Sequence, residues 1–151
     1  MLEEIYNYLL LTESIATAGQ PTKQQIAAIA ESGYEVVINL GLADAEYALE
    51  NEEAVVRAHG MQYIHLPVVW ERPTKFDLEQ FFKAMEANQN KKVFIHCAAN
   101  MRVSAFMALY RILRLGWPED KAFEQVQRIW IPNDTWQTFI DEILNQNDPD
   151  L

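Results

Sequence analysis

The sequence predicts an α/β fold, with a mostly parallel sheet flanked by helices. Short β-branched, apolar runs at residues 36–40, 63–66 and 92–96 alternate with helical patterns. Such alternation is typical of parallel strands joined by right-handed crossovers. The chain has 151 residues, 50% of them hydrophobic, which suffices for one sizeable core but not for two. We therefore expect a single domain over residues 1–151.

The first half of the chain contains two expected strands and two helical segments. Residues Thr22 to Gln25 have the pattern of a capping box, which predicts a helix over 22–32 that ends at Gly33. The strand 36–40 follows. Residues 45–58 return to a charged, helix-compatible pattern, and the strand at 63–66 ends before a proline.

The second half of the chain is expected to be mainly helical. A loop from 68 to 74 leads to a helix through Phe81, Phe82 and Met85, and the strand 92–96 follows. Residues 103–115 are apolar almost all round, which predicts a helix through the middle of the domain. Another helix starts near Pro118 and the last spans about 133–144, leaving a tail at 145–151 that we expect to fray.

Charge and cysteine content exclude several classes of partner. The 12 Lys and Arg against 22 Asp and Glu give a net charge of −10, which repels nucleic acid and anionic membranes. An anionic ligand must therefore be captured locally, by backbone amides and a few cations. The single cysteine, Cys97, cannot form an internal disulfide, and early acids stand where a secretory signal would carry bases. These features favour a cytoplasmic setting.

The segment from His96 to Ser104 is the first place to look for chemistry. It leaves a strand and enters a helix, and ligands of parallel sheets bind beyond the carboxyl ends of the strands. Small residues follow Cys97, so unpaired amides and the helix dipole would stabilise a thiolate and cradle a tetrahedral oxyanion. The alternative is that Cys97 is a small buried hydrophobic residue.

His96, Cys97 and Ser104 in this strand-loop-helix setting resemble the loop of the protein tyrosine and dual-specificity phosphatases, whose pattern is H-C-x-x-G-x-x-R-S/T. Residues 19–21, 36–40 and 63–68 also resemble a bacterial phosphatase-like family of largely uncharacterised function. The resemblance implies a dual-specificity-phosphatase-like fold with the cysteine loop between a central strand and a buried helix. It also implies no metal or cofactor, phosphate or sulfate in the loop, and a phosphorylated small molecule or a phosphoprotein as partner.

The same resemblance assigns roles to the loop residues. Cys97 would be the nucleophile of a cysteinyl-phosphate intermediate, and His96 would orient the loop and lower the pKa of the thiol indirectly, by hydrogen bonding. Ser104 would donate a hydrogen bond to the Cys97 sulfur and help it to leave. Asn100 replaces the usual glycine, and asparagine enters left-handed backbone conformations more readily than most residues. The phosphate-binding loop would comprise Ala98, Ala99, Asn100, Met101, Arg102 and Val103.

The arginine departs from the family pattern. Ser104 falls at the expected distance from Cys97, but Val103 occupies the arginine position and the arginine is Arg102. Moving a residue by one place at a helix start swings its side chain by about 100°. Either the backbone adjusts so that the guanidinium still clamps phosphate, or phosphate binding is weakened or altered. A solvated or salt-bridged residue at the helix start is the alternative interpretation of Arg102.

The general acid is also displaced. The family's aspartate lies in the loop after the preceding strand, where this chain has Trp70, so Glu71 is the nearest carboxylate and the candidate acid. An ordinary exposed glutamate is the alternative. Gln20 and Trp70 are possible lining residues, and Asp134 either caps a helix or folds back over the site.

The leading hypothesis is therefore a metal-independent phosphatase that acts through Cys97. A catalytically weak module that binds phosphate or a phosphoprotein is the second hypothesis. A sulfurtransferase that carries sulfane sulfur on Cys97 is the third, because it also uses a cysteine in a short anion-binding loop.

Overall fold

Five strands form one sheet at the centre of the molecule. The computed structural model describes residues 1–146, and the strand order is β1-β2-β5-β3-β4. Every pairing except that of β1 with β2 is parallel, so the predicted mostly parallel sheet is confirmed. The strands are β1 (Leu9–Thr12), β2 (Ile15–Ala18), β3 (Val36–Asn39), β4 (Gln62–His65) and β5 (Val93–His96).

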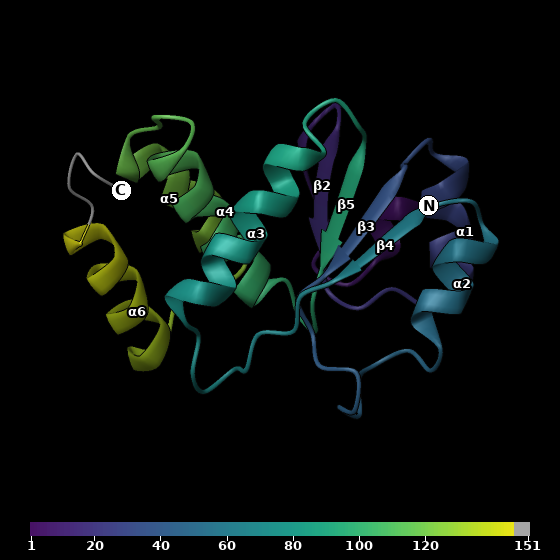
Figure 1. The fold of residues 1–151 in the computed structure, drawn as a ribbon, viewed down its shortest axis with the longest axis horizontal. Helices are drawn as coiled ribbons and strands as arrows, with labels where there is room; N and C mark the ends of the chain where they lie inside the picture. The colour runs from purple at the N-terminus through teal and green to yellow at the C-terminus, as the bar shows by residue number, and fades with distance from the viewer. Residues whose placement is uncertain (147–151) are drawn as a thin grey trace.

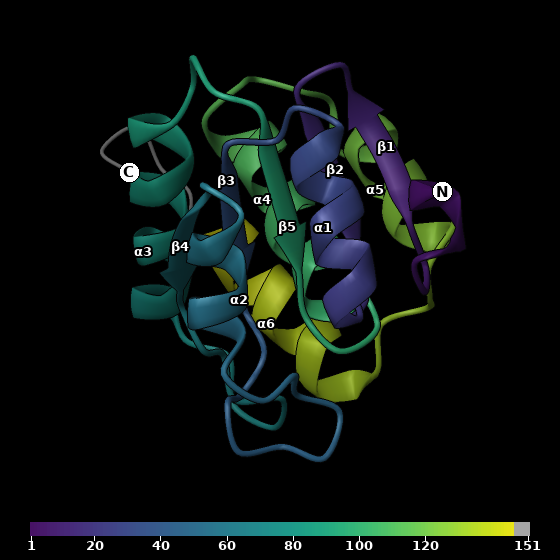
Figure 2. The ribbon, with the colours of Figure 1, turned by 90° about the vertical axis from the view of Figure 1, so that its right-hand side faces the viewer.

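Helices cover both faces of the sheet (Figures 1 and 2). One face carries α1 and α2 and the short N-terminal turn η1, whereas α3, α4, α5 and α6 lie on the opposite side. The helical elements are η1 (Leu2–Glu4), α1 (Lys23–Glu31), α2 (Glu52–Ala58), α3 (Lys75–Ala87), α4 (Met101–Leu113), α5 (Glu119–Gln127) and α6 (Asp134–Asn145). None of the helices within residues 1–146 has the length and apolarity needed to cross a bilayer.

Two hydrophobic cores lie on the two faces of the sheet. Val36 and Ile38 of β3 pack into the core with α3, α4 and α6, whereas Val37 packs into the core with α1 and α2. The same alternation separates Ile95 from Phe94 in β5. All residues of β3 and β5 are buried, which explains why these strands appear in the sequence as continuous apolar runs.

Most of the expected elements form, but one expected helix is shorter than predicted and two strands were not expected. Thr22 and Gln25 make both bonds of the predicted capping box at α1. The helix expected over 45–58 begins only at Glu52. Asn51 adopts a left-handed backbone with φ of 56°, which interrupts helical geometry immediately before α2. Strands β1 and β2 were not anticipated, and residues 147–151 of the expected fraying tail lie outside the described residues.

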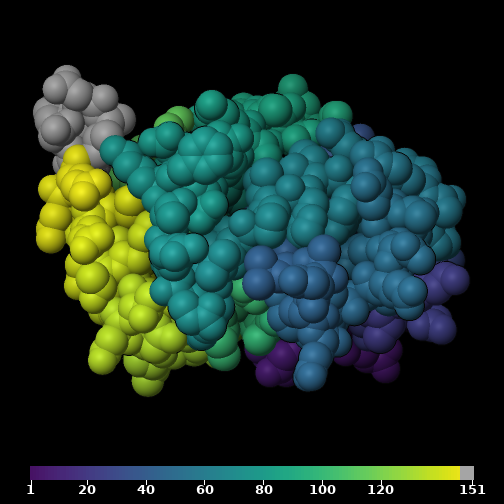
Figure 3. Space-filling view, turned by 60° about the horizontal axis from the view of Figure 1, so that its bottom comes forward, coloured from purple at the N-terminus to yellow at the C-terminus, as the bar shows by residue number. Residues whose placement is uncertain are grey.

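The carboxyl ends of the parallel strands share one edge of the sheet. Loops after β2, β3, β4 and β5 therefore meet there, as Figure 1 shows below the sheet. Figure 3 brings this side of the molecule forward, and the segment that follows β3, coloured blue, protrudes from it. Any chemistry of the Cys97 loop takes place at this edge.

Candidate active site

The cysteine loop connects β5 to α4 and is held by both. Strand β5 lies between β2 and β3, and α4 is buried from Arg102 to Arg111. This confirms the expected position of the loop between a central strand and a buried helix. Asn100 has φ of 64°, so asparagine does adopt the left-handed conformation that the family pattern reserves for glycine. Its side-chain amide donates to Asn7 O at 2.9 Å and to Thr17 Oγ1 at 3.0 Å.

The loop directs its carbonyl groups toward the protein and leaves most of its amides free. Ala98 O accepts from Gln20 N at 3.0 Å, and Ala99 O accepts from Asn7 Nδ2 at 2.8 Å. Within residues 1–146, the backbone N–H groups of residues 98, 99 and 101 to 103 donate no hydrogen bond, whereas the Asn100 N–H faces Ala18 O in the isolated antiparallel bridge between Gly19 and Ala99. Five free N–H groups before and at the start of a helix form a site that is suited to a tetrahedral anion.

Cys97 is fully buried and packs with the core that lies under α4. Its backbone N–H donates to Ala18 O at 3.4 Å, which ties it to the adjacent strand β2. Burial of the side chain fits both the nucleophile and the core-residue interpretation of Cys97. The free amides that follow it are the feature that a purely structural cysteine does not require.

Arg102 is neither solvated nor salt-bridged, so both forms of the alternative expected for it are wrong. Its side chain is 4% exposed and has no carboxylate partner within residues 1–146. Nη1 donates to Val68 O at 2.9 Å and Nη2 donates to Tyr47 Oη at 3.1 Å. The guanidinium carbon also lies 5.8 Å from the Tyr47 ring centre and 5.7 Å from that of Trp70. The remaining N–H groups of the guanidinium have no hydrogen-bond partner within residues 1–146.

Ser104 is occupied by neighbours other than sulfur. Its hydroxyl donates to Met101 O at 2.8 Å and accepts from Trp130 Nε1 at 3.1 Å. A serine hydroxyl has one proton, so a bond from Ser104 to the Cys97 sulfur requires rotation of that hydroxyl. The expected donation to sulfur stays a prediction.

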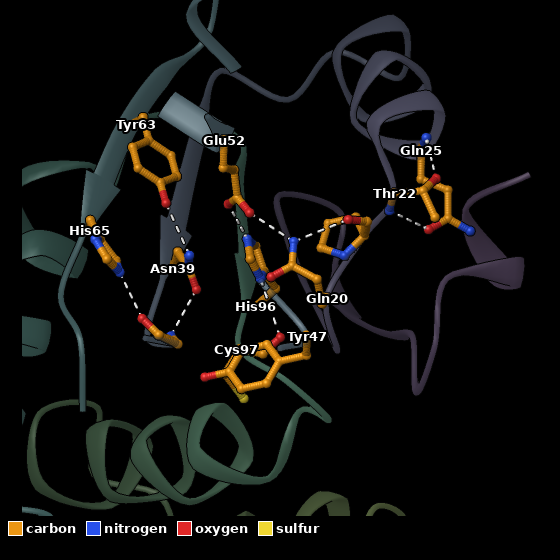
Figure 4. Close-up of polar contacts among 12 residues, drawn as sticks. Gln20, Thr22, Gln25, Asn39, Tyr47, Glu52, Tyr63, His65, His96 and Cys97 are labelled. Carbon is orange, nitrogen blue, oxygen red and sulfur yellow. Dashed lines mark hydrogen bonds and ion pairs between the residues drawn. The ribbon is translucent and has the colours of Figure 1, made fainter. Parts of the chain in front are cut away.

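A buried polar network lies behind the cysteine (Figure 4). His96 Nε2 is 2.6 Å from Glu52 Oε2, and the other oxygen of Glu52 accepts from Gln20 Nε2 at 2.7 Å. His96 Nδ1 lies 3.3 Å from Cys97 O. Burial raises the pKa of the Glu52 carboxyl, but the hydrogen bond and charge of His96 and the bonds from Gln20 and Tyr63 outweigh it, so the pKa lies below its ordinary value.

Neither candidate acid is hydrogen-bonded to this network within residues 1–146. Glu71 and Asp134 are exposed, and neither makes a hydrogen bond or an ion pair through its side chain within residues 1–146. Asp134 opens α6, and its neighbour Asn133 is the residue whose side chain caps that helix. Trp70 packs against Trp130 and Trp136, with ring centres 5.3 and 5.8 Å away.

Sequence reasoning missed Glu52 and Tyr47. Glu52 and His96 lie 44 positions apart, and no local pattern connects them. Tyr47 lies in a segment that was expected to be helical, although its hydroxyl also accepts from Leu42 N at 2.8 Å and so fixes the turn after β3. Both residues become recognisable only when the carboxyl ends of the strands are brought together.

Comparison with known proteins places this geometry in a family. A DUF442 protein from Shewanella putrefaciens CN-32, described as a candidate phosphatase, is 30% identical, with a TM-score of 0.87 over 96% of this chain and 95% of that one. Kinase associated phosphatase, 12% identical, shares the fold with a TM-score of 0.80 over 95% and 97% of the two chains. TpbA of P. aeruginosa, 18% identical, does so with a TM-score of 0.67 over 86% and 74%.

A relative of known sequence is the beta-lactamase hydrolase-like protein of Xylella fastidiosa. It is 27% identical over 106 residues, which are 68% of this chain. These 106 residues make up 24% of the relative, so the chain spans about a quarter of the length of the curated relatives it matches. Residues 11–140 match the profile of a phosphatase family, and the chain belongs to that family, described as DSP-PTPase phosphatase fused to NAD+ kinase.

Proposed function

We propose that this chain is a metal-independent phosphomonoesterase that acts through a cysteinyl-phosphate on Cys97. The observation that carries the proposal is the set of backbone N–H groups at residues 98, 99 and 101–103, which donate no hydrogen bond within residues 1–146. Fixed donors of this kind bind the oxygens of a phosphate and stabilise the charge that develops during its transfer. Membership of the phosphatase family supports the same chemistry.

The proposed reaction has two steps. The Cys97 thiolate forms a bond to phosphorus while the bond from phosphorus to the alcohol oxygen breaks, and an acid protonates the departing alcohol. Water then attacks phosphorus, the bond between sulfur and phosphorus breaks, and inorganic phosphate leaves. Glu71 is the proposed acid, and Ser104 is proposed to help sulfur leave after its hydroxyl turns from Met101 O.

Arg102 is proposed to add a charged clamp to the amides. Its bonds to Val68 O and Tyr47 Oη use two of its five N–H groups. The other three are enough for a two-point contact with a phosphate, and the rings of Tyr47 and Trp70 hold the guanidinium in place. In this proposal, Gln20 acts through Glu52 rather than by contacting the ligand.

The proposed substrate is a phosphorylated small molecule or a phosphoprotein. TpbA has been crystallised in complex with phosphotyrosine, which supports a phosphate ester as the ligand of this fold. Because the net charge of the chain is −10, the general field of the protein repels an anionic ester, so the loop itself must hold the ester.

A second candidate function is a module that binds phosphate with little turnover. It is favoured by the Ser104 hydroxyl, which donates to Met101 O instead of the Cys97 sulfur, and by the exposure of Glu71, which makes no hydrogen bond within residues 1–146. The amide cradle would serve such a module equally well.

Hydrolysis of 4-nitrophenyl phosphate in the presence of EDTA separates these candidates. The phosphatase proposal expects turnover by the wild type, none by Cys97→Ser, and phosphate binding by both in calorimetry. Phosphate binding without Cys97-dependent turnover would favour the module. Persulfide on Cys97 after incubation with thiosulfate, together with an absence of phosphate ester hydrolysis, would instead favour a sulfurtransferase.

A further inference from the structure

The pairing of Glu52 with His96 brings together two titratable groups in the interior. Glu52 opens α2 and His96 ends β5, and their side chains are 5% and 0% exposed. The distance of 2.6 Å between Oε2 and Nε2 is that of a short, charge-assisted hydrogen bond. Burying such a pair costs several kcal/mol of desolvation.

The hydrogen-bond partners of the imidazole define its protonation. A carboxylate and a backbone carbonyl can only accept hydrogen bonds. Glu52 Oε2 faces Nε2, and Cys97 O faces Nδ1 at 3.3 Å. Only the imidazolium form of His96, with a proton on each nitrogen, donates to both acceptors. Gln20 Nε2 donates to the other oxygen of Glu52 at 2.7 Å, as expected of an ionised carboxyl that accepts at both oxygens.

Among residues 1–146, the other titratable groups around the pair do not supply a competing charge. Asn39 of β3 donates to the hydroxyl of Tyr63, and burial first, then the charge of Glu52, raises the pKa of that tyrosine, which keeps it neutral. His65 of β4 is engaged with Gly41 O. On α2, Glu53 points outward and pairs with Arg57.

We propose that Glu52 is a positioning residue that holds His96 as an imidazolium beside Cys97. The imidazole lies between the carboxylate and the main chain of the cysteine, so the positive end of the pair faces the loop. There it favours the thiolate of Cys97 over the thiol. Gln20 holds the carboxylate in place by donating from its Nε2 to Glu52 Oε1. This inference rests on the proposed function in one respect, which is that the thiolate serves to attack a phosphate ester.

The direct test is nuclear magnetic resonance of the histidine ring nitrogens. At pH 7 the wild type should show two protonated nitrogens for His96, and Glu52→Gln should show a neutral ring. Glu53→Gln, one position along the same helix and at the surface, should leave His96 as in the wild type. A neutral His96 in the wild type, or an imidazolium that persists in Glu52→Gln, would overturn the proposal.

Two further readouts separate positioning from folding and from activity. Loss of one neighbouring charge shifts a titration by about one pH unit or more, so the pH profile of Cys97 alkylation should move upward by that amount in Glu52→Gln. Gln20→Ala keeps both Glu52 and His96, so it replaces Glu52→Gln as the test variant if Glu52→Gln does not fold. The alkylation profile of Cys97 in Gln20→Ala should shift in the same direction. An unshifted profile in a folded variant contradicts the role of Glu52.

The ring-nitrogen signals do not depend on turnover. If the wild type hydrolyses no phosphate ester but His96 is an imidazolium that depends on Glu52, the proposed function fails and the positioning role stands. If turnover depends on Cys97 but His96 is neutral, the positioning role fails alone.

Discussion

Replacing Arg102 by lysine tests whether the displaced arginine binds the anion. The guanidinium has five N–H groups, of which Val68 O and Tyr47 Oη take two. A lysine has three, so after the same two contacts it has one left for a phosphate, where arginine has enough for a two-point clamp. The variant therefore loses one charge-assisted hydrogen bond to the ligand.

A charge-assisted hydrogen bond contributes about 1.5–3 kcal/mol. At about 1.4 kcal/mol per tenfold, Arg102→Lys should weaken phosphate binding by about 10- to 150-fold. Isothermal titration with inorganic phosphate measures this directly. Arg114→Lys is the matched control, because Arg114 ends the same helix but forms a surface pair with Glu86, and its replacement should leave the Kd unchanged. A change of less than twofold in Arg102→Lys would assign the arginine to structure alone.

Substitutions at three other positions test further parts of the site. Asn100→Ala should lower the free energy of unfolding by about 1 kcal/mol more than Asn100→Gly in urea titrations, because φ is 64° there; equal losses would contradict this reason. The lowered pKa of Glu52 contributes stability that is present above its ordinary value of 4.5 and is lost as the pH falls through the lower folded value. Glu52→Gln should therefore flatten the acid side of the stability profile, and an unchanged profile would oppose this. Glu71→Gln should slow hydrolysis of phenyl phosphate by about 10²–10⁴-fold and that of 4-nitrophenyl phosphate much less, since the better leaving group needs no proton; equal effects would exclude Glu71 as the acid.

The parts of the fold that the sequence predicted are those with strong local patterns. The doubly buried strands β3 and β5 appear as unbroken β-branched runs, and the capping box at Thr22 marks the start of α1. Strands β1 and β2 escaped because the sequences LLLT and IATA contain few apolar β-branched residues, and because β1 lies at the edge of the sheet and is only partly buried. The segment before Glu52 has a helical composition, but the bond from Leu42 N to the Tyr47 hydroxyl and the left-handed Asn51 override it.

The candidate site likewise has one part that could be predicted from the sequence and one part that could not. Cys97 and the left-handed Asn100 lie in one short segment, so their relation could be predicted from the sequence. The environment of Arg102 could not, because Val68 and Tyr47 come from loops after two other strands. The single domain over residues 1–151 and the catalytic roles of the individual residues stay predictions.

The most direct test of the account is detection of the covalent intermediate. Wild-type protein mixed with a phosphate ester and quenched in acid within one turnover should carry a single phosphoryl group on the peptide that contains Cys97. The group should be absent from Cys97→Ser handled in the same way. Turnover without any phosphoryl group on Cys97, or undiminished turnover by Cys97→Ser, would contradict the central claim.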